Sequence, residues 1–256
     1  MKPRISVIGT GRWGKTLLRK FHHLGGLHLV YGHQNRDVLQ PLNLRFAEDI
    51  DQLIEESDAV VVATPSETHA EVGERVLQAK KDLFLEKPMA LSSQEARHLT
   101  WLAEDSNCVL MVGHVLCYST GFTKLSALPG ETVAAHGKFL KTTTPEKYLN
   151  AYWDMGVHCV ALAIALRVPM IQFKLDASAE ATVNQRTFEL QRKTSDGQLH
   201  SLLWDFLAPE NQEDMLMVEC RHFLACVNNR ETPRTDGRQG VQTIEALEKI
   251  HPEQRA

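Results

Sequence analysis

The chain has 256 residues, a formal net charge of −4 at pH 7, 43% hydrophobic residues and 23% charged residues. This length fits one large domain or two small ones, and it can bury a core without disulfide or metal support. No segment approaches the roughly 20 apolar residues that a membrane-spanning helix needs. The acidic balance disfavours a nucleic-acid-binding surface. We therefore expect a globular protein without a membrane or nucleic-acid partner.

The N-terminus and the cysteines favour a cytoplasmic location. The apolar run at residues 5–8 is too short for the central region of a secretion signal. The five cysteines include no CxxC pair and no ligand-spaced cluster with histidine. We therefore expect reduced core cysteines, with neither a disulfide framework nor a metal site.

The first half of the chain alternates short apolar runs with helical patterns. The pattern predicts strands at residues 5–8, 27–31, 59–63, 83–85 and 109–112, with helices at 14–24, 51–56, 67–80 and 92–104. Ser92 and Glu95 have the spacing of a capping box at the start of the last helix. Because the strands are apolar throughout, they predict a parallel sheet covered on both faces. Residues 1–115 should form a doubly wound α/β domain.

The second half has a different pattern, with more alternating strands. Strands are predicted at residues 132–139, 171–177, 183–191 and 200–206, and helices at 154–166, 215–227 and 239–250. A polar loop is expected at 141–147, and Ser195-Asp196-Gly197 is typical of a hairpin turn. Residues 116–256 should form a smaller α+β domain.

A glycine pattern follows the first predicted strand. Gly9, Gly11 and Gly14 form a GxGxxG sequence that opens a helix, the context in which this motif binds a dinucleotide pyrophosphate. A glycine-rich turn without a ligand is the alternative. The second strand ends without the acidic residue typical of NAD sites, whereas His33 and Arg36 suit a 2′-phosphate. This favours NADP over NAD, although Arg36 also fits a solvated loop.

Two further groups are candidates for catalysis. Lys87 follows a parallel strand, at the edge of the sheet where ligands bind, and it could polarise a carbonyl or stabilise an alkoxide. Asp154 and His158 are four residues apart, so on a helix Asp154 could orient His158 as a general base. A surface lysine beside a turn, and a helix-capping aspartate with a core histidine, are the structural alternatives.

Taken in order, these segments resemble the glucose–fructose oxidoreductase/inositol dehydrogenase/MocA (Gfo/Idh/MocA) family. The resemblance rests on the glycine motif, Thr64-Pro65 with His69, Glu86-Lys87-Pro88, Asp154 with His158, and the C-terminal segments 219–224 and 233–237. Residues 11–15, 110–116 and 152–154 look most like nucleotide-sugar 3-dehydrogenases that act on UDP-N-acetylhexosamines. Cys117 and Cys159 depart from the family pattern, and the chain is shorter than usual after His158.

The resemblance implies a Rossmann domain followed by a domain on an open, mostly antiparallel sheet, here shortened. It implies catalysis by Lys87, Asp154 and His158, and NADP or NAD as the cofactor. It also implies further cofactor contacts from Arg12, Trp13, Thr64, Pro65, His69, Glu86, Lys87 and Trp153. The expected substrate is a sugar, cyclitol or nucleotide sugar, and an exposed sheet face is compatible with a homodimer.

Two other functions fit parts of this pattern. A dinucleotide-binding sensor or partner protein would need the glycine motif but not all three of Lys87, Asp154 and His158. An imine or enone reductase would need a proton donor but no sugar pocket.

Overall fold

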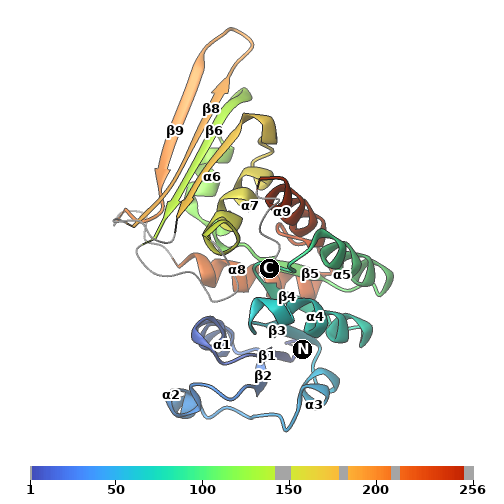
Figure 1. The fold of residues 1–256 in the computed structure, drawn as a ribbon. Coiled ribbons are helices and arrows are strands. Elements are labelled where there is room, and N and C mark those ends of the chain that lie inside the picture. Colours follow the sequence, from blue (N-terminus) through green and yellow to red (C-terminus); the bar gives the residue numbers. More distant parts are fainter. Residues whose placement is uncertain (1, 142–150, 179–183, 209–213, 251–256) are drawn as a thin grey trace. The chain divides into compact units, whose positions relative to one another are not determined.

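The structure is a computed structural model that describes residues 2–141, 151–178, 184–208 and 214–250 (Figure 1). The contacts divide the chain into two units. The first contains residues 1–113 and 216–241, and the second contains residues 114–215 and 242–256. The domain expected over 116–256 therefore differs from the second unit, because a C-terminal segment packs with the first. Val183 and most of the loop expected at 141–147 lie outside the described residues.

The first unit contains a five-stranded parallel sheet in the order β2-β1-β3-β4-β5. The strands are β1 (Ile5–Ile8), β2 (Leu27–Tyr31), β3 (Ala59–Val62), β4 (Asp82–Glu86) and β5 (Leu110–Gly113). Every residue of β1, β3, β4 and β5 is buried. This confirms the doubly wound α/β prediction, since only a sheet covered on both faces buries whole strands.

Helices cover both faces of this sheet. These helices are α1 (Arg12–Leu24), α3 (Ile50–Glu55), α4 (His69–Gln78), α5 (Ser93–Asp105) and α8 (Met215–Asn229). The short helix α2 (Arg36–Leu39) lies in the connection after β2. Figure 1 shows α1 and α8 on one face and α4 and α5 on the other. The Ser92 hydroxyl accepts the Glu95 N–H, and the Glu95 carboxylate accepts the Leu91 N–H. The predicted capping residues therefore start α5.

The C-terminal segment joins the first unit through an aromatic cluster. Phe223 of α8 contacts Phe21 of α1 and Phe84 of β4 edge to face, with ring centroids 6.2 and 5.6 Å apart. Further along, Thr235 exchanges hydrogen bonds with Val112 of β5. Burying three phenylalanines stabilises the unit by several kcal/mol, roughly 2 per side chain. These contacts explain why residues 216–241 belong with the first unit.

The second unit contains a four-stranded mixed sheet in the order β7-β6-β8-β9. Its strands are β6 (Glu131–Leu140), β7 (Phe173–Ser178), β8 (Gln185–Lys193) and β9 (Leu199–Asp205). β6 pairs with β7 in parallel and with β8 antiparallel, and β8 and β9 form the predicted hairpin. Gly197 has a φ of +87° in the connecting turn. The two sheets together confirm the predicted fold class.

The helices of the second unit pack on one face of its sheet. They are α6 (Thr120–Ser126), a π-helical turn at Tyr152–Gly156 and α7 (Val157–Ala165). The end of α9 (Gly237–Ile250) also belongs to this unit. Gly137 of β6 leaves room for the Cys159 side chain of α7, because a Cβ there would overlap the sulfur atom. The structure shows all five cysteines free, and the burial of four of them agrees with the predicted core positions.

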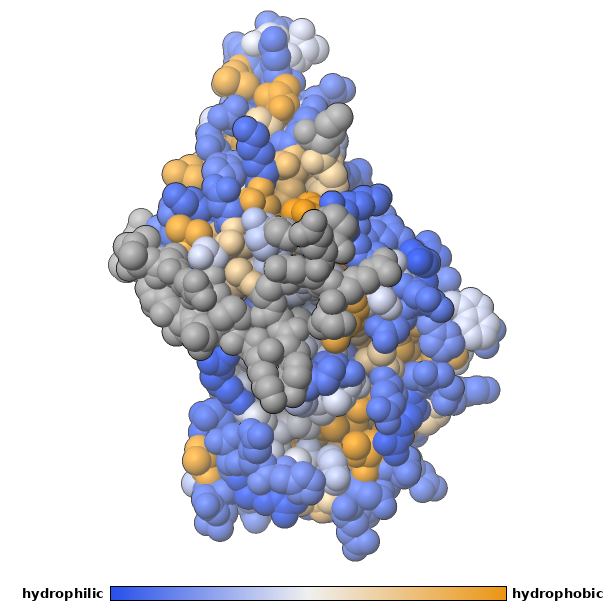
Figure 2. Space-filling view, in the orientation of Figure 1, coloured by the Kyte–Doolittle hydropathy of each residue, from blue (hydrophilic) through white to orange (hydrophobic). Residues whose placement is uncertain are grey.

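The other face of this sheet is exposed. Leu199 and Leu203 of β9 are each 61% exposed. Figure 2 shows hydrophobic residues interspersed with hydrophilic ones over the β8–β9 hairpin. Among the described helices, none has both the length and the apolar character needed to cross a bilayer.

Candidate cofactor and catalytic residues

The glycine-rich turn lies at the carboxyl end of β1, where two of its glycines are required by the fold. Gly9 has a φ of +104°, and a Cβ there would overlap the carbonyl oxygen of Ala63. A Cβ on Gly14 would overlap the carbonyl oxygen of Gly9. These two glycines bring the first turn of α1 against the ends of β1 and β3.

Gly11 differs from its two neighbours in the motif. Its φ is −65°, and the nearest atom to an added Cβ is the side-chain oxygen of Gln34 at 3.8 Å. The fold of the chain therefore leaves room for a side chain here. Gly11 also caps α1 without a side-chain hydrogen bond. A bare backbone at a helix N-terminus suits the close approach of a pyrophosphate.

The loop after β2 is held against this turn. The Asn35 side-chain amide donates to the carbonyl of Thr10 at 2.7 Å, and Arg36 Nε donates to the carbonyl of Gly32 at 2.9 Å. The Arg36 guanidinium also lies over the Phe46 ring, 4.6 Å from its centroid. His33 and Arg36 are both exposed. A positively charged group is thus fixed at the end of the second strand, where the ribose of a dinucleotide is normally recognised.

His69 joins the loops that follow β3 and β4. The imidazole is buried, and its two nitrogens lie 2.7 Å from the carbonyl oxygen of Pro88 and 2.9 Å from that of Thr64. Burial lowers the pKa of His69, and the two carbonyls oppose this shift. Both contacts are full hydrogen bonds only when both nitrogens carry a proton. His69 therefore cross-links the segments that carry Thr64-Pro65 and Glu86-Lys87-Pro88.

Lys87 directly follows β4, and its backbone is bonded to the side chain of Glu86. The Lys87 N–H donates to Glu86 Oε2 at 3.2 Å, and the Lys87–Pro88 peptide bond is cis. Glu86 pairs with Gly113 of β5, and a Cβ on Gly113 would lie 3.1 Å from the Glu86 carboxyl carbon. Gly113 thus leaves room for the Glu86 side chain. Lys87 is half-buried at the same carboxyl edge as the glycine-rich turn.

A second carboxyl group, Glu219 of α8, is buried in the first unit. The side chain is fully buried, and neither carboxyl oxygen has a hydrogen-bond partner among the described residues. Glu219 precedes Phe223 by one helical turn, and Glu86 follows Phe84 by two residues on the same face of the sheet. Burial raises the pKa of Glu219 well above its usual range, and the Glu86 charge adds to this effect. Glu219 belongs to the C-terminal segment quoted for the family resemblance, but the sequence alone assigned it no role.

The second unit carries Trp153, Asp154 and His158. Trp153 and Asp154 lie in the π-helical turn rather than in the predicted α-helix, which begins only at Val157. π-Helical turns within helices are frequent at functional sites. Trp153 and Asp154 are buried and His158 is half-buried. Asp154 Oδ2 lies 3.8 Å from Lys141 Nζ.

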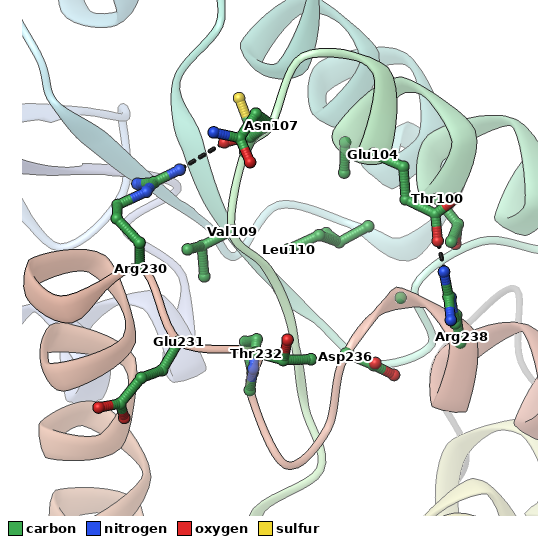
Figure 3. Close-up of a pocket in the computed structure, with 14 residues that line it drawn as sticks. Thr100, Glu104, Asn107, Val109, Leu110, Arg230, Glu231, Thr232, Asp236 and Arg238 are labelled. Atoms are coloured by element: carbon green, nitrogen blue, oxygen red, sulfur yellow. Dashed lines mark hydrogen bonds and ion pairs between the residues drawn. The ribbon is translucent and has the colours of Figure 1, made fainter.

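A pocket of about 430 Å³ lies at the opposite edge of the first sheet (Figure 3). It is lined by the end of α5, the start of β5 and residues 230–238. Its two arginines are already paired, Arg230 with Asp82 at 2.6 Å and Arg238 with Glu104 at 2.7 Å. This pocket is therefore distinct from the carboxyl edge that carries the predicted cofactor residues.

The structure thus groups the predicted residues within each unit. Residues from the first unit meet at the carboxyl ends of its strands: Gly9, Gly11, Arg12, Trp13, Gly14, His33, Arg36, Thr64, Pro65, His69, Glu86 and Lys87. Trp153, Asp154 and His158 share one continuous helical segment of the second unit. Ligands of open parallel sheets bind at the carboxyl edge, so the first group defines a dinucleotide-binding class of protein.

Comparisons with known proteins agree with this class. Residues 3–114 match the GFO_IDH_MocA family, described as "Oxidoreductase family, NAD-binding Rossmann fold". Residues 3–114 are therefore similar to the NAD-binding Rossmann domain of this oxidoreductase family.

Individual relatives are similar over the same part of the chain. An uncharacterized oxidoreductase of Streptococcus pneumoniae is 32% identical over 123 residues, 46% of this chain and 34% of that protein. UDP-N-acetylglucosamine 3-dehydrogenase of Acidithiobacillus ferrooxidans is 33% identical over 115 residues, 44% of this chain and 37% of that protein. These matches thus span about a third of the length of each relative.

The solved structure of the Acidithiobacillus ferrooxidans enzyme GnnA has the same fold. It matches with a TM-score of 0.84 and 21% identity, covering 100% of this chain and 98% of that one. At this identity the match describes the fold of the chain and leaves its substrate open.

We expect replacement of Glu219 to change how stability depends on pH. The raised pKa means that folded Glu219 keeps its proton while the unfolded side chain loses it above about pH 4.3. The wild type should therefore lose stability relative to Glu219→Gln as the pH rises, by about 1.4 kcal/mol per pH unit until the folded pKa is reached. Urea unfolding of both proteins at pH 5 and pH 8 measures this difference.

The matched control for this prediction is Glu71→Gln, at an exposed position of α4. Its difference from the wild type should stay constant between the two pH values. A pH-independent difference for Glu219→Gln would show that the side chain is ionised in the folded protein.

We expect Gly11→Ala to separate dinucleotide binding from folding. Because the chain leaves room for the methyl group, stability should change by no more than about 0.5 kcal/mol. The methyl group would crowd a bound pyrophosphate, so affinity for NAD or NADP should fall by about tenfold or more. Thermal unfolding and a fluorescence titration with reduced cofactor measure the two effects. In contrast, Gly14→Ala should destabilise the fold itself, and wild-type affinity in Gly11→Ala would remove Gly11 from the binding site.

Proposed function

We propose that the protein transfers hydride between NAD(P) and a secondary alcohol or ketone of a sugar, cyclitol or nucleotide sugar. The observation that carries this proposal is Lys87, a half-buried cation on the carboxyl edge that also bears the glycine-rich turn. The bare backbone of Gly11 and the N-terminus of α1 fit the pyrophosphate of such a cofactor. The similarity to UDP-N-acetylglucosamine 3-dehydrogenase supports a nucleotide sugar as one member of the substrate class.

In the proposed reaction, His158 accepts the proton of the substrate hydroxyl. Asp154, in the buried π-helical turn, orients the imidazole and stabilises its protonated form. Lys87 stabilises the negative charge that develops on the substrate oxygen. The bound nicotinamide supplies the hydride acceptor, and in the reverse direction His158 returns the proton to the carbonyl oxygen. Glu86 and His69 position Lys87 through the Lys87 N–H and the Pro88 carbonyl.

We propose NADP as the preferred cofactor. Residues 31–36 contain no carboxylate, the group that would hold the 2′-hydroxyl of NAD. Arg36 instead presents an exposed guanidinium whose Nε is anchored to the Gly32 carbonyl. A guanidinium recognises a phosphate through paired hydrogen bonds.

We expect Arg36→Gln to reduce selectivity for NADP. Affinity for NADPH should fall by about tenfold because one charge-assisted contact is lost, while affinity for NADH should change by less than about threefold. Fluorescence titrations with both reduced cofactors measure the ratio. Arg45→Gln, an exposed arginine on the neighbouring segment, is the control. Equal losses for NADH and NADPH in Arg36→Gln would contradict a role in binding the 2′-phosphate.

We expect Lys87→Met and His158→Ala to abolish the chemical step while leaving the cofactor bound. Each should slow hydride transfer by about a hundredfold or more, because each removes a charge or a proton acceptor that the chemical step uses. Wild type and variants are mixed with NADP⁺ or NAD⁺ and a panel of UDP-N-acetylhexosamines, their uronic acids, free sugars and inositols. Absorbance of the reduced nicotinamide is followed at enzyme concentrations that reveal a single turnover.

Two control variants remove the same residue types elsewhere. Lys80→Met changes an exposed lysine at the opposite end of β4, and His136→Ala changes a histidine paired with Asp176. Both should retain wild-type turnover. Turnover in Lys87→Met at the wild-type rate would remove Lys87 from the mechanism. Tight cofactor binding without turnover of any panel member would favour a sensor or a reductase of imines or enones.

A further inference from the structure

Arg186 lies among apolar side chains on the inner face of the second sheet. Along β8 it alternates in phase with Phe188 and Leu190, which are both buried, and it pairs in register with Phe139 of β6. Side chains two residues apart on a strand share one face. The Arg186 side chain therefore starts from the face that α7 and the π-helical turn cover, although a charged residue is costly there.

The guanidinium of Arg186 has no close partner in the described part of the chain. No described residue forms an ion pair or side-chain hydrogen bond with it, although it is half-buried. Burial lowers the pKa of Arg186, and the Asp154 charge opposes this shift. A guanidinium carries five N–H donors, so several of these donors are available to a ligand.

Arg192 lies on the same face of β8 as Arg186, and its side-chain contacts have a structural role. Its terminal nitrogens donate to the carbonyl oxygens of Leu128 at 2.6 Å, Leu166 at 3.2 Å and Ser126 at 3.3 Å. Arg192 thereby ties three carbonyls to β8. Arg186 makes no comparable contacts with the described residues, so the structure gives it no equivalent role in holding the fold together.

Lys141 provides a second cation at the same end of the sheet. It directly follows β6, and its N–H donates to the Ser178 carbonyl at the end of β7. The Lys141 ammonium lies 3.8 Å from the Asp154 carboxylate. The charge of the same carboxylate also acts on Arg186. Arg186 and Lys141 thus supply two cationic side chains at this end of the second sheet.

We propose that Arg186, assisted by Lys141, binds an anionic group of the substrate. The group is a carboxylate on the sugar ring or a phosphate of a nucleotide sugar, since a planar guanidinium bonds either through paired N–H donors. This inference rests on the proposed function, because it takes Asp154 and His158 as the reacting end of the same substrate. It narrows the substrate class from sugars and cyclitols in general to those that carry negative charge.

Isothermal titration calorimetry tests this proposal without requiring turnover. The 256-residue chain is titrated in saturating NADPH, which is expected to occupy the cofactor site and prevent alcohol oxidation, and again without cofactor. The anionic probes are UDP-N-acetylglucosamine and glucuronate, and the uncharged probes are N-acetylglucosamine and myo-inositol. The proteins are the wild type, Arg186→Met, Arg186→Lys and Lys174→Met. Lys174 is an exposed lysine of β7 on the other face of the sheet.

The wild type should bind at least one anionic probe more tightly than its uncharged counterpart. Arg186→Met should weaken that binding by about tenfold or more, and Arg186→Lys should recover part of it because the charge returns without the planar donors. Lys174→Met should bind like the wild type, and affinity for the uncharged probes should not change. Circular dichroism and thermal unfolding establish that each variant is folded.

The probe affected identifies the source of the charge. Loss confined to UDP-N-acetylglucosamine indicates a phosphate, and loss confined to glucuronate indicates a ring carboxylate. No binding of either anionic probe to the wild type, or equal binding to Arg186→Met, would overturn the proposal. If an anionic probe binds in an Arg186-dependent way but no panel compound is oxidised, the anion site would be supported and the proposed dehydrogenase activity would be contradicted. If a neutral cyclitol is oxidised at the same rate by the wild type and Arg186→Met, and no anionic probe binds, the dehydrogenase activity would be supported and the anion site contradicted.

Discussion

The close approach of α1 to the carbonyl oxygen of Gly9 is the constraint on which the first unit depends. Without a Cβ on Gly14, the first turn of the helix reaches the ends of β1 and β3. That contact places unpaired helix N–H groups at the carboxyl edge of a buried parallel sheet. Thr64, Glu86 and Lys87 lie at the ends of the neighbouring strands at the same edge, so the parallel sheet brings the predicted cofactor residues into one region.

Buried ionisable groups lower the free energy of unfolding of the protein. Glu219 and Glu86 place two carboxyl groups in the first unit, and His69 lies between two carbonyl oxygens. In the second unit, Arg186 lies on the same face of the sheet as Phe188 and Leu190, and Asp154 is buried in the π-helical turn. Such groups cost free energy when buried, so a fold shaped only by packing would exclude them. Glu86 directly precedes Lys87, and Asp154 precedes His158 by four residues, which supports the proposed chemistry.

Local sequence patterns predict most of the first unit because its signals are local. Apolar runs bounded by helices locate the strands, and β1 and β2 end where the pattern ends, at Ile8 and Tyr31. The capping residues Ser92 and Glu95 locate the start of α5. Contacts between segments that are far apart in the sequence cannot be predicted in this way. The apolar face of α8 is evident in the sequence. The spacing of its apolar residues does not predict, however, that Phe223 packs against Phe21 and Phe84.

In the candidate site, too, local features can be predicted from the sequence and long-range contacts cannot. Glycine spacing and the position of Lys87 after a strand are readable locally, and Asp154 and His158 are readable as a spaced pair. The π-helical turn at Asp154 has no such local signal, and Gly156 in this turn lies close to Leu175 and Ala177 of the distant strand β7. Arg186 was also missed. Its alternation with Phe188 and Leu190 is visible in the sequence, but the pairing of β8 with β6 is needed to place it opposite Phe139.

The central claim is that the carboxyl edge of the first sheet binds a nicotinamide dinucleotide. The most direct measurement is a calorimetric titration of the wild-type protein with NADP⁺ and NAD⁺ at low ionic strength. The account predicts one site per chain with a dissociation constant in the micromolar range, corresponding to about −8 kcal/mol. Absence of binding of both dinucleotides at millimolar concentration, by a folded protein, would contradict it.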